Sequence, residues 1–305
     1  MSRGADAGRG SDGGAIRLFD LHTHTRASDG LLAPAELVAQ AGTCLAGLAV
    51  TDHDTVAGLA EALAAGEEAG VPVVPGVELT TDHGPYEVHI LAYFVDHGHE
   101  GLLAALGRVI EGRVARAKEI VARLARRGLP LPWAEVERQA PGVFIGRPHI
   151  MRALIARGMV HPAHADRFFR QNLAAGAPAF VPHMEMTTGE AIGLALAAGG
   201  VPVLAHPGRT GADHLLPELL AQGLQGIEAR YPSHTPGETA RYERLAREHD
   251  LVVTGGSDYH GNTDGPRLGQ AAAPPANVAA LAERAASRFG RAFLSALHVP
   301  GKKGE

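Results

Sequence analysis

Two pairs of polar residues in this sequence have the spacing of metal ligands. His22 and His24 stand one residue apart in FDLHTHTRASDG, with Asp29 five residues later, and Asp258 and His260 stand one residue apart in SDYHG. Side chains at positions i and i+2 of a strand point to the same side, so each pair can converge on one ion. Imidazole and carboxylate groups are common ligands of divalent metals, and the pairs predict metal-based chemistry. Either pair alone is also compatible with polar residues at an ordinary strand exit.

Further polar residues follow or interrupt other apolar runs. His53 comes just after GLAV, Glu78 lies near the end of VPVVPGVEL, His89 lies inside EVHILAYF, and His206 follows VPVLA. A lone buried histidine is more often a hydrogen-bonded core residue than a ligand, but a buried carboxylate needs a cation or strong hydrogen bonds. With the two pairs, six of the seven predicted strands end in or contain a metal-competent side chain, which indicates one shared site.

Seven short runs rich in Val, Ile and Leu predict the strands that must position these residues. They are residues 17–21, 47–51, 71–78, 88–93, 201–206, 226–229 and 251–255. Ala-rich amphipathic segments between them predict helices at 34–42, 56–69, 188–198 and 237–250. This alternation indicates an α/β fold of βα units with a parallel sheet or barrel, and seven strands favour the barrel. Active sites of βα barrels lie at the carboxyl ends of the strands, where most of these polar residues fall.

The middle of the chain has a helical pattern instead. GLLAALGRVIEGRVARAKEIVARLARRG, WAEVERQA and HIMRALIARG predict helices, and the next strand-like run is 179–181. Six arginines between Arg108 and Arg127 favour a solvated helix face, with a basic face over an anionic ligand as the alternative. The predicted organisation is a disordered tail (1–16), a discontinuous barrel domain (17–100 and 183–298) and a helical insert domain (101–182).

Composition limits the classes of function. The chain has 305 residues, of which 45% are hydrophobic and 20% charged, as in soluble globular proteins. A net charge of −5 argues against a duplex nucleic-acid surface but allows a local basic pocket. Cys44 is the only cysteine, which excludes an intramolecular disulfide and a thiolate metal site. With neither a signal-peptide run nor a long apolar stretch, we expect a cytoplasmic protein that does not bind membranes.

Four motifs, in order, resemble those of the polymerase and histidinol phosphatase (PHP) family. They are DLHTHT, TDHD, LAHPG and SDYHG, with the glutamate of PGVE between them, and the pattern covers residues 17–276 apart from the helical interruption. The stretches GVE, HILAYF, GRPHI, AHPGR and YPSHT are similar to one subgroup. That subgroup dephosphorylates nucleoside 3′,5′-bisphosphates and includes ribonuclease AM, which trims short RNA from the 5′ end. The resemblance implies a distorted (β/α)₇ barrel, the PHP fold, holding three metal ions.

The resemblance also implies which residues hold each ion. The first would be surrounded by His22, His24, Glu78 and Asp258, the second by Asp29, His53 and His260, and the third by Glu78, His89 and His206, with Glu78 bridging. Some family members have histidine where this chain has Asp29. A carboxylate there is a harder ligand, which favours manganese, with iron, zinc or a mixture as alternatives.

The implied reaction is hydrolysis of the 3′-phosphate by in-line attack of a metal hydroxide, without a covalent enzyme intermediate. Asp29, His53, His260 and Arg147 are the predicted catalytic residues. Arg147, His149, Arg209 and His234 are predicted to bind the second phosphate and the sugar, since arginine suits phosphate. A surface arginine is the alternative for Arg147, and non-binding roles are equally open for Arg209 and His234.

Two further pairs have weaker predicted roles. Tyr231 or Phe144 could stack on a base. Asp52 and Asp54 flank His53 and are predicted to orient imidazoles, with a loop-capping role as the alternative.

Other functions stay open at this stage. A histidinol-phosphate phosphatase or another PHP phosphatase or exonuclease would use the same ligands, because loops and the insert set the substrate. A non-catalytic metal-binding module is disfavoured because all nine expected positions carry competent side chains. The expected partner is a small nucleotide or the 5′ end of a short oligonucleotide; the sequence decides neither between these two nor the oligomeric state.

Overall fold

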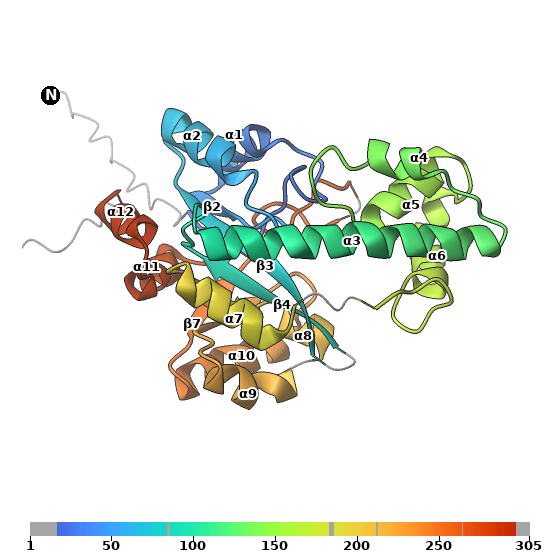
Figure 1. The fold of residues 1–305 in the computed structure, drawn as a ribbon. Coiled ribbons are helices and arrows are strands. Elements are labelled where there is room, and N and C mark those ends of the chain that lie inside the picture. The colour runs from blue at the N-terminus through green and yellow to red at the C-terminus, as the bar shows by residue number, and fades with distance from the viewer. Residues whose placement is uncertain (1–16, 84–85, 183–185, 212, 264, 297–305) are drawn as a thin grey trace, which may run out of the picture.

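A seven-stranded sheet organises the part of the chain that the structure describes. This computed structural model describes residues 17–83, 86–182, 186–211, 213–263 and 265–296; the predicted tail at 1–16 lies outside them. Within those ranges the strand order follows the chain (Figure 1). The strands are β1 Phe19–Asp20, β2 Gly47–Val50, β3 Val73–His83, β4 Tyr86–Tyr93, β5 Val201–Leu204, β6 Gly226–Arg230 and β7 Val252–Gly255. All seven coincide with predicted runs.

The sheet curls into a nearly closed barrel, which confirms the predicted fold class. The Leu21 N–H donates to the Gly255 carbonyl at 3.1 Å and joins β1 to the end of β7. Inside the barrel, apolar side chains such as Leu21, Leu91 and Tyr93 form a packed layer. Polar side chains that end or interrupt the strands lie above this layer, as in other βα barrels.

The expectation of an all-parallel sheet is wrong for β4. This strand pairs antiparallel with both β3 and β5, whereas the other pairs are parallel. A parallel crossover needs a dozen or more residues, but β3 ends at His83 and β4 begins at Tyr86, so the two form a hairpin. The hairpin also lengthens β3, and Glu78 therefore lies in the middle of a strand rather than near its end.

Helices cover the outside of the barrel. α1 and α2 lie on one side of it, and α7, α9 and α10 on the opposite side (Figure 1). None of the helices in the described residues is long and apolar enough to cross a membrane. Their bounds are α1 Pro34–Cys44, α2 Leu59–Ala69, α7 Thr188–Ala197, α8 Pro207–Thr210, α9 Leu216–Ala221, α10 Pro236–Glu248, α11 Pro275–Arg284 and α12 Arg288–Ala296.

The helical middle is built on one long helix, α3 (Glu100–Arg126), which runs from the barrel into the insert (Figure 1). Leu102, Leu106 and Val109 of its first half pack in the barrel's outer core. Ile120 and Leu124 of its second half pack with the insert helices. The predicted division at residue 101 remains a prediction, since the helix is continuous with both parts. The remaining insert helices are α4 Trp133–Arg138, α5 Arg147–Ala156 and α6 Ala165–Asn172, of which α6 was not predicted.

The predicted strand at 179–181 does not form; these residues are turn and coil. Their carbonyls are used by arginine side chains of α3 instead of a strand partner. Arg123 Nη1 donates to the Phe180 carbonyl at 2.5 Å, and Arg116 Nε donates to the Val181 carbonyl at 2.7 Å.

Candidate metal centre

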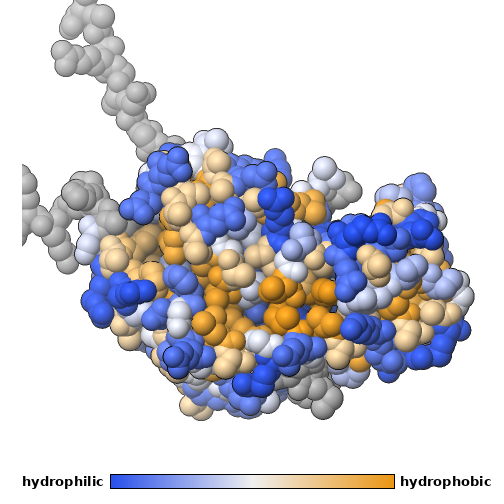
Figure 2. All heavy atoms as spheres, turned by 45° about the horizontal axis from the view of Figure 1, so that its top comes forward, coloured by the Kyte–Doolittle hydropathy of each residue, from blue (hydrophilic) through white to orange (hydrophobic). Residues whose placement is uncertain are grey.

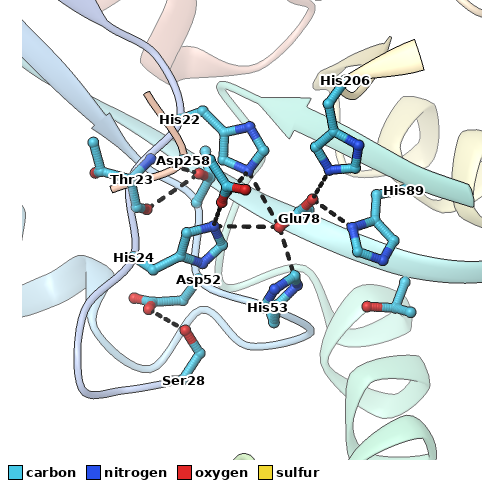
Figure 3. A network of polar contacts seen from close by, with 12 residues as sticks. His22, Thr23, His24, Ser28, Asp52, His53, Glu78, His89, His206 and Asp258 are labelled. Atoms are coloured by element: carbon cyan, nitrogen blue, oxygen red, sulfur yellow. Dashed lines mark hydrogen bonds and ion pairs between the residues drawn. The ribbon is translucent and has the colours of Figure 1, made fainter. Parts of the chain in front are cut away.

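Glu78 lies at the centre of a cluster of imidazoles in the barrel mouth (Figure 3). Its side chain is fully buried. In the β3–β4 ladder its neighbour Thr80 pairs with His89, so Glu78 and His89 share the inner face of the barrel. Ring nitrogens of five histidines lie 2.7 to 3.3 Å from its two oxygens: His22, His24 and His53 at Oε2, and His89 and His206 at Oε1.

Two aspartates complete the cluster from other strand ends. Asp258 Oδ1 lies 3.1 Å from His24 Nε2, and Asp29 Oδ1 lies 3.1 Å from His260 Nε2. All nine side chains predicted as metal ligands therefore converge. Three groups have ligand atoms within 4.8 Å of one another: His22, His24, Glu78 and Asp258; His24, Asp29, His53 and His260; and His53, Glu78 and His89.

The donor atoms of this cluster fit divalent cations. Buried polar atoms in folded proteins are normally hydrogen-bonded. Here several buried atoms of the cluster have no hydrogen bond among the described residues. Six imidazoles and three carboxylates that lie this close together form a donor set that suits divalent cations. The atoms are His22 Nε2, both ring nitrogens of His24, His53 Nδ1, Glu78 Oε2 and His206 Nδ1.

Local backbone geometry at the strand ends is adapted to the cluster. His206 has φ 27° and Asp258 has φ 55°, in the left-handed region that non-glycine residues rarely occupy. Such conformations concentrate at functional sites, where surrounding structure holds them. Beside them, a Cβ on Gly256 would lie 2.2 Å from the Cβ of His22. Glycine there lets the end of β7 pass close to His22.

Glu228 on β6 is a site residue that the sequence interpretation missed. It is fully buried. The Nδ1–H of His22 donates to its Oε1 at 3.0 Å, and the backbone N–H of His206 donates to its Oε2 at 2.8 Å. It thereby directs His22 Nε2 toward Glu78, as outer carboxylates commonly do for metal-binding histidines. The available signal was a single charged residue inside the apolar run GIEA.

Asp52 and Asp54 make no hydrogen bond to an imidazole among the described residues, contrary to the prediction. Asp52 accepts hydrogen bonds from the Thr25 backbone, the Thr25 hydroxyl and the Ser28 hydroxyl at 2.6 to 2.7 Å. It caps the loop that carries Asp29, as in the alternative interpretation. Asp54 accepts from the Thr80 N–H at 2.8 Å and from Arg113 Nε at 2.7 Å.

Comparison with known proteins agrees with this geometry. The family model of the PHP domain matches residues 20–128. The 3′,5′-nucleoside bisphosphate phosphatase of Chromobacterium violaceum is 35% identical over 261 residues, covering 82% of this chain and 89% of that protein. The chain belongs to the PHP family. The 5′-3′ exoribonuclease Rnm of Salmonella typhimurium is 34% identical and covers 88% of this chain and 94% of its own length.

A solved structure supports the same placement. The chain of a metal-dependent phosphoesterase from Bifidobacterium adolescentis superposes with a TM-score of 0.82 at 35% identity, over 90% of this chain and 98% of that one. The protein is thus a metal-dependent phosphoesterase of the PHP family, a hydrolase of phosphoesters. The cluster around Glu78 is its candidate metal centre.

A cavity of ≈ 520 Å³ opens over the candidate metal centre around Glu78. Arg147 from the start of α5 lines it, and its Nη2 donates to both carboxylate oxygens of Glu87 at 2.8 and 3.0 Å. Arg209 also lines it and donates to Tyr231 Oη and to Asp258 Oδ2, both at 3.1 Å. The cavity therefore has a metal-competent floor and cationic walls.

The insert contributes more cations to this cavity than the sequence interpretation assigned. Arg113 and Arg116 of α3 line it, with side chains only 6% and 7% exposed. The favoured interpretation of a solvated arginine face is therefore wrong for these two residues. They lie on the side of α3 that faces the barrel. The alternative interpretation, a basic helix face over a ligand cavity, describes them better.

His149 and His234 support the site without lining the cavity among the described residues. His149 is fully buried, and its Nδ1 accepts from the Gly146 N–H at 3.1 Å, which caps the start of α5. His234 Nε2 accepts from the Gly208 N–H at 3.2 Å and holds the turn after His206. Both residues were predicted to contact the substrate; this geometry favours a supporting role instead.

The guess that Phe144 stacks on a base is also wrong. One face of its ring stacks on His53, with centroids 5.6 Å apart and an interplanar angle of 15°, and the Arg113 guanidinium lies 4.4 Å from its centroid. Tyr231 lines the cavity, and its hydroxyl donates to Asp258 Oδ2 at 2.8 Å. A stacking role for Tyr231 remains a prediction.

When no cation is bound, protons on histidines can balance the negative charge of the carboxylates in the metal centre. Burial lowers the pKa of His89, but Glu78 and Glu87 outweigh it and raise that pKa to about 9. Burial likewise lowers the pKa of His260, and Asp29 and Asp258 raise it to about 9. Burial raises the pKa of Glu78, but the surrounding histidines, His53 first, hold it well below its usual value. Cations and protons must therefore compete for this site.

This competition predicts opposite pH trends for the metal-free and metal-loaded forms. The pKa values of His89 and His260 lie above the ordinary 6.5. Their protonated forms therefore stabilise the metal-free fold fully below about pH 6.5, and this stabilisation is lost as pH rises through about 9. Over the same interval we expect metal affinity to increase. Melting temperatures of chelator-treated and manganese-loaded protein between pH 6.5 and 9 test this; a metal-free melting temperature that rises across that window contradicts it.

Proposed function

We propose that this chain is a phosphatase that removes the 3′-phosphate of nucleoside 3′,5′-bisphosphates, with 5′-to-3′ trimming of short 5′-phosphorylated oligonucleotides as a further activity. The observation that carries the proposal is one cavity with the metal-competent Glu78 cluster on its floor and Arg147 on its wall, so that a phosphate could bind at each. A substrate with two phosphates on one ribose matches this arrangement. The two relatives described above act on this class of substrate or on RNA ends, according to their names.

The proposed cofactor is a set of three divalent ions, with manganese preferred. His22, His24, Glu78 and Asp258 would hold the first, Asp29, His53 and His260 the second, and Glu78, His89 and His206 the third. When bound, such ions neutralise phosphoryl charge, activate the attacking water and stabilise the leaving oxygen. Two close groupings of ligand atoms match the first two assignments, and the third grouping contains Glu78 and His89 with His53; His206 Nε2 lies 3.1 Å from Glu78 Oε1.

The chain's own residues would orient the substrate around these ions. Arg147 would bind the second phosphate, because a guanidinium fork pairs with phosphate oxygens through charge-assisted hydrogen bonds. In the structure the carboxylate of Glu87 takes that position. Arg209 would face the scissile phosphate from beside Asp258, to which it is 3.1 Å distant.

The distribution of charge favours a polyanionic substrate for the trimming activity. Residues 101–182 contain 13 Lys and Arg against 5 Asp and Glu, a net charge of +8. Since the whole chain carries −5, all other residues together carry −13. In Figure 2 the lobe on the right, which contains α4, α5 and α6, carries hydrophilic side chains along its edges, as do other parts of the visible surface. A phosphate chain leaving the cavity would be attracted to the insert and repelled by the barrel.

A substrate panel on manganese-reconstituted protein tests the proposal. It compares adenosine 3′,5′-bisphosphate, adenosine 5′-monophosphate, histidinol phosphate and a 5′-phosphorylated trinucleotide. We expect the highest kcat/KM on the bisphosphate, measurable turnover of the trinucleotide and little on the 5′-monophosphate. The best turnover on histidinol phosphate would establish the alternative function instead.

A further inference from the structure

Phe144 packs against two planar groups beside the metal centre. The imidazole of His53 lies against one face of Phe144, nearly parallel to it at 15° and with centroids 5.6 Å apart. The guanidinium carbon of Arg113 lies 4.4 Å from the same ring centroid. Phe144 is only 2% exposed. Phe144 precedes α5 in the insert and His53 follows β2 of the barrel, so this stack joins the insert to the metal centre.

His53 differs from His22 and His260 in how its ring is fixed. The ring of His22 is held by a hydrogen bond to Glu228 (3.0 Å), and that of His260 by one to the Asp258 carbonyl (2.8 Å). Among the described residues, no hydrogen bond fixes the His53 ring; its close polar neighbour is another candidate ligand, Glu78 Oε2, at 3.0 Å. The stack on Phe144 therefore occupies the role that an outer hydrogen bond has elsewhere.

Arg113 holds this stack in place from behind. Its Nε donates to Asp54 Oδ2 at 2.7 Å and its Nη2 donates to Thr80 Oγ1 at 2.5 Å. Asp54 directly follows His53, and its Oδ1 accepts from the Thr80 backbone at 2.8 Å. One guanidinium thus binds the backbone segment of His53 through Asp54 and packs on the ring that covers its imidazole.

We propose that Phe144, backed by Arg113, is a positioning residue for His53, so that the helical insert completes the ion site formed by Asp29, His53 and His260. This inference rests on the proposed role of His53 as a ligand. The insert then has two functions: it supplies cations for the substrate and controls the occupancy of one particular ion. Glu228 holds the His22 ring and the backbone of His206, so the sites that use these two residues do not depend on the stack.

Metal binding, rather than turnover, tests this role. Manganese bound per chain is measured by equilibrium dialysis at a series of free manganese concentrations. For Phe144→Leu we expect the affinity for one ion per chain to fall about 10- to 100-fold, the usual effect of losing an outer partner of a metal ligand, with the remaining ions unchanged. Phe144→Tyr keeps the ring face and should bind like the wild type. Arg113→Lys keeps the charge beside Asp54 but cannot stack, and should weaken the same ion.

The control is Phe169→Leu, which removes another phenylalanine of the insert that lines the cavity. Its ring faces the Arg147 guanidinium at 5.5 Å and no candidate ligand, so manganese binding should stay at the wild-type level. Unchanged binding in both Phe144→Leu and Arg113→Lys, or a uniform loss of all ions in both, overturns the positioning role. A wild-type chain that binds fewer than three ions would instead count against the ligand assignment of the proposed function.

Discussion

Replacing Glu78 with glutamine is expected to lower kcat/KM more than about 1000-fold, equivalent to about 4 kcal/mol of transition-state stabilisation. Glutamine keeps the shape but removes the one carboxylate that five imidazoles share at 2.7 to 3.3 Å. The ligand set then loses the negative charge that holds neighbouring cations together. We therefore expect the metal content of the purified protein to fall together with activity.

Steady-state kinetics and elemental analysis of the same preparation measure this effect. Glu119→Gln is the matched control, since Glu119 is an exposed residue of α3 that pairs with Arg123 and Arg126 at 3.0 Å. Circular dichroism establishes that both variants are folded. A Glu78→Gln protein with full metal content and more than a tenth of wild-type activity would exclude a bridging role for Glu78.

Replacing Arg147 with alanine is expected to change specificity rather than chemistry. For adenosine 3′,5′-bisphosphate, kcat/KM should fall about 10- to 100-fold, because hydrogen bonds to charged groups contribute about 1.5–3 kcal/mol. For an aryl phosphate, which has no second phosphate, the change should be less than about twofold. Loss of Arg147 also frees Glu87, which lies 3.6 Å from His89 Nε2, but this affects both substrates and cancels in their ratio.

The ratio of the two kcat/KM values is the measurement. Arg126→Ala serves as the control, since that arginine, at the end of α3, is 63% exposed and pairs with Glu119 at the surface. Equal loss on the bisphosphate and the aryl phosphate would remove Arg147 from substrate recognition and leave it a structural role.

Much of the fold and of the metal centre was predictable because strand periodicity is local. The i, i+2 spacing of His22 and His24, and of Asp258 and His260, is sufficient to place each pair on one face. Apolar runs ending in His53 and His206 extend the same argument to other strands. Nine predicted ligands converge in the structure for this reason, although each run alone was ambiguous.

Residues that depend on the path of the chain were less predictable. Glu228 lies inside an apolar run, and only the closed barrel shows that it faces His22 and His206. Arg113 and Arg116 resemble any solvated helix face until α3 is seen to turn that side toward the cavity. His149 and His234 matched family motifs, but their ring nitrogens are used in holding backbone turns.

The sequence by itself determined the class of fold, the set of metal-competent side chains and the family, because alternation and motif spacing are properties of short segments. Only the tertiary structure decided that Glu78 is the shared centre of five imidazoles, and that Phe144 packs on His53 instead of a base. Each of these depends on contacts between segments far apart in the chain. Such contacts are set by barrel closure and by the packing of α3 across both parts, which no local pattern encodes.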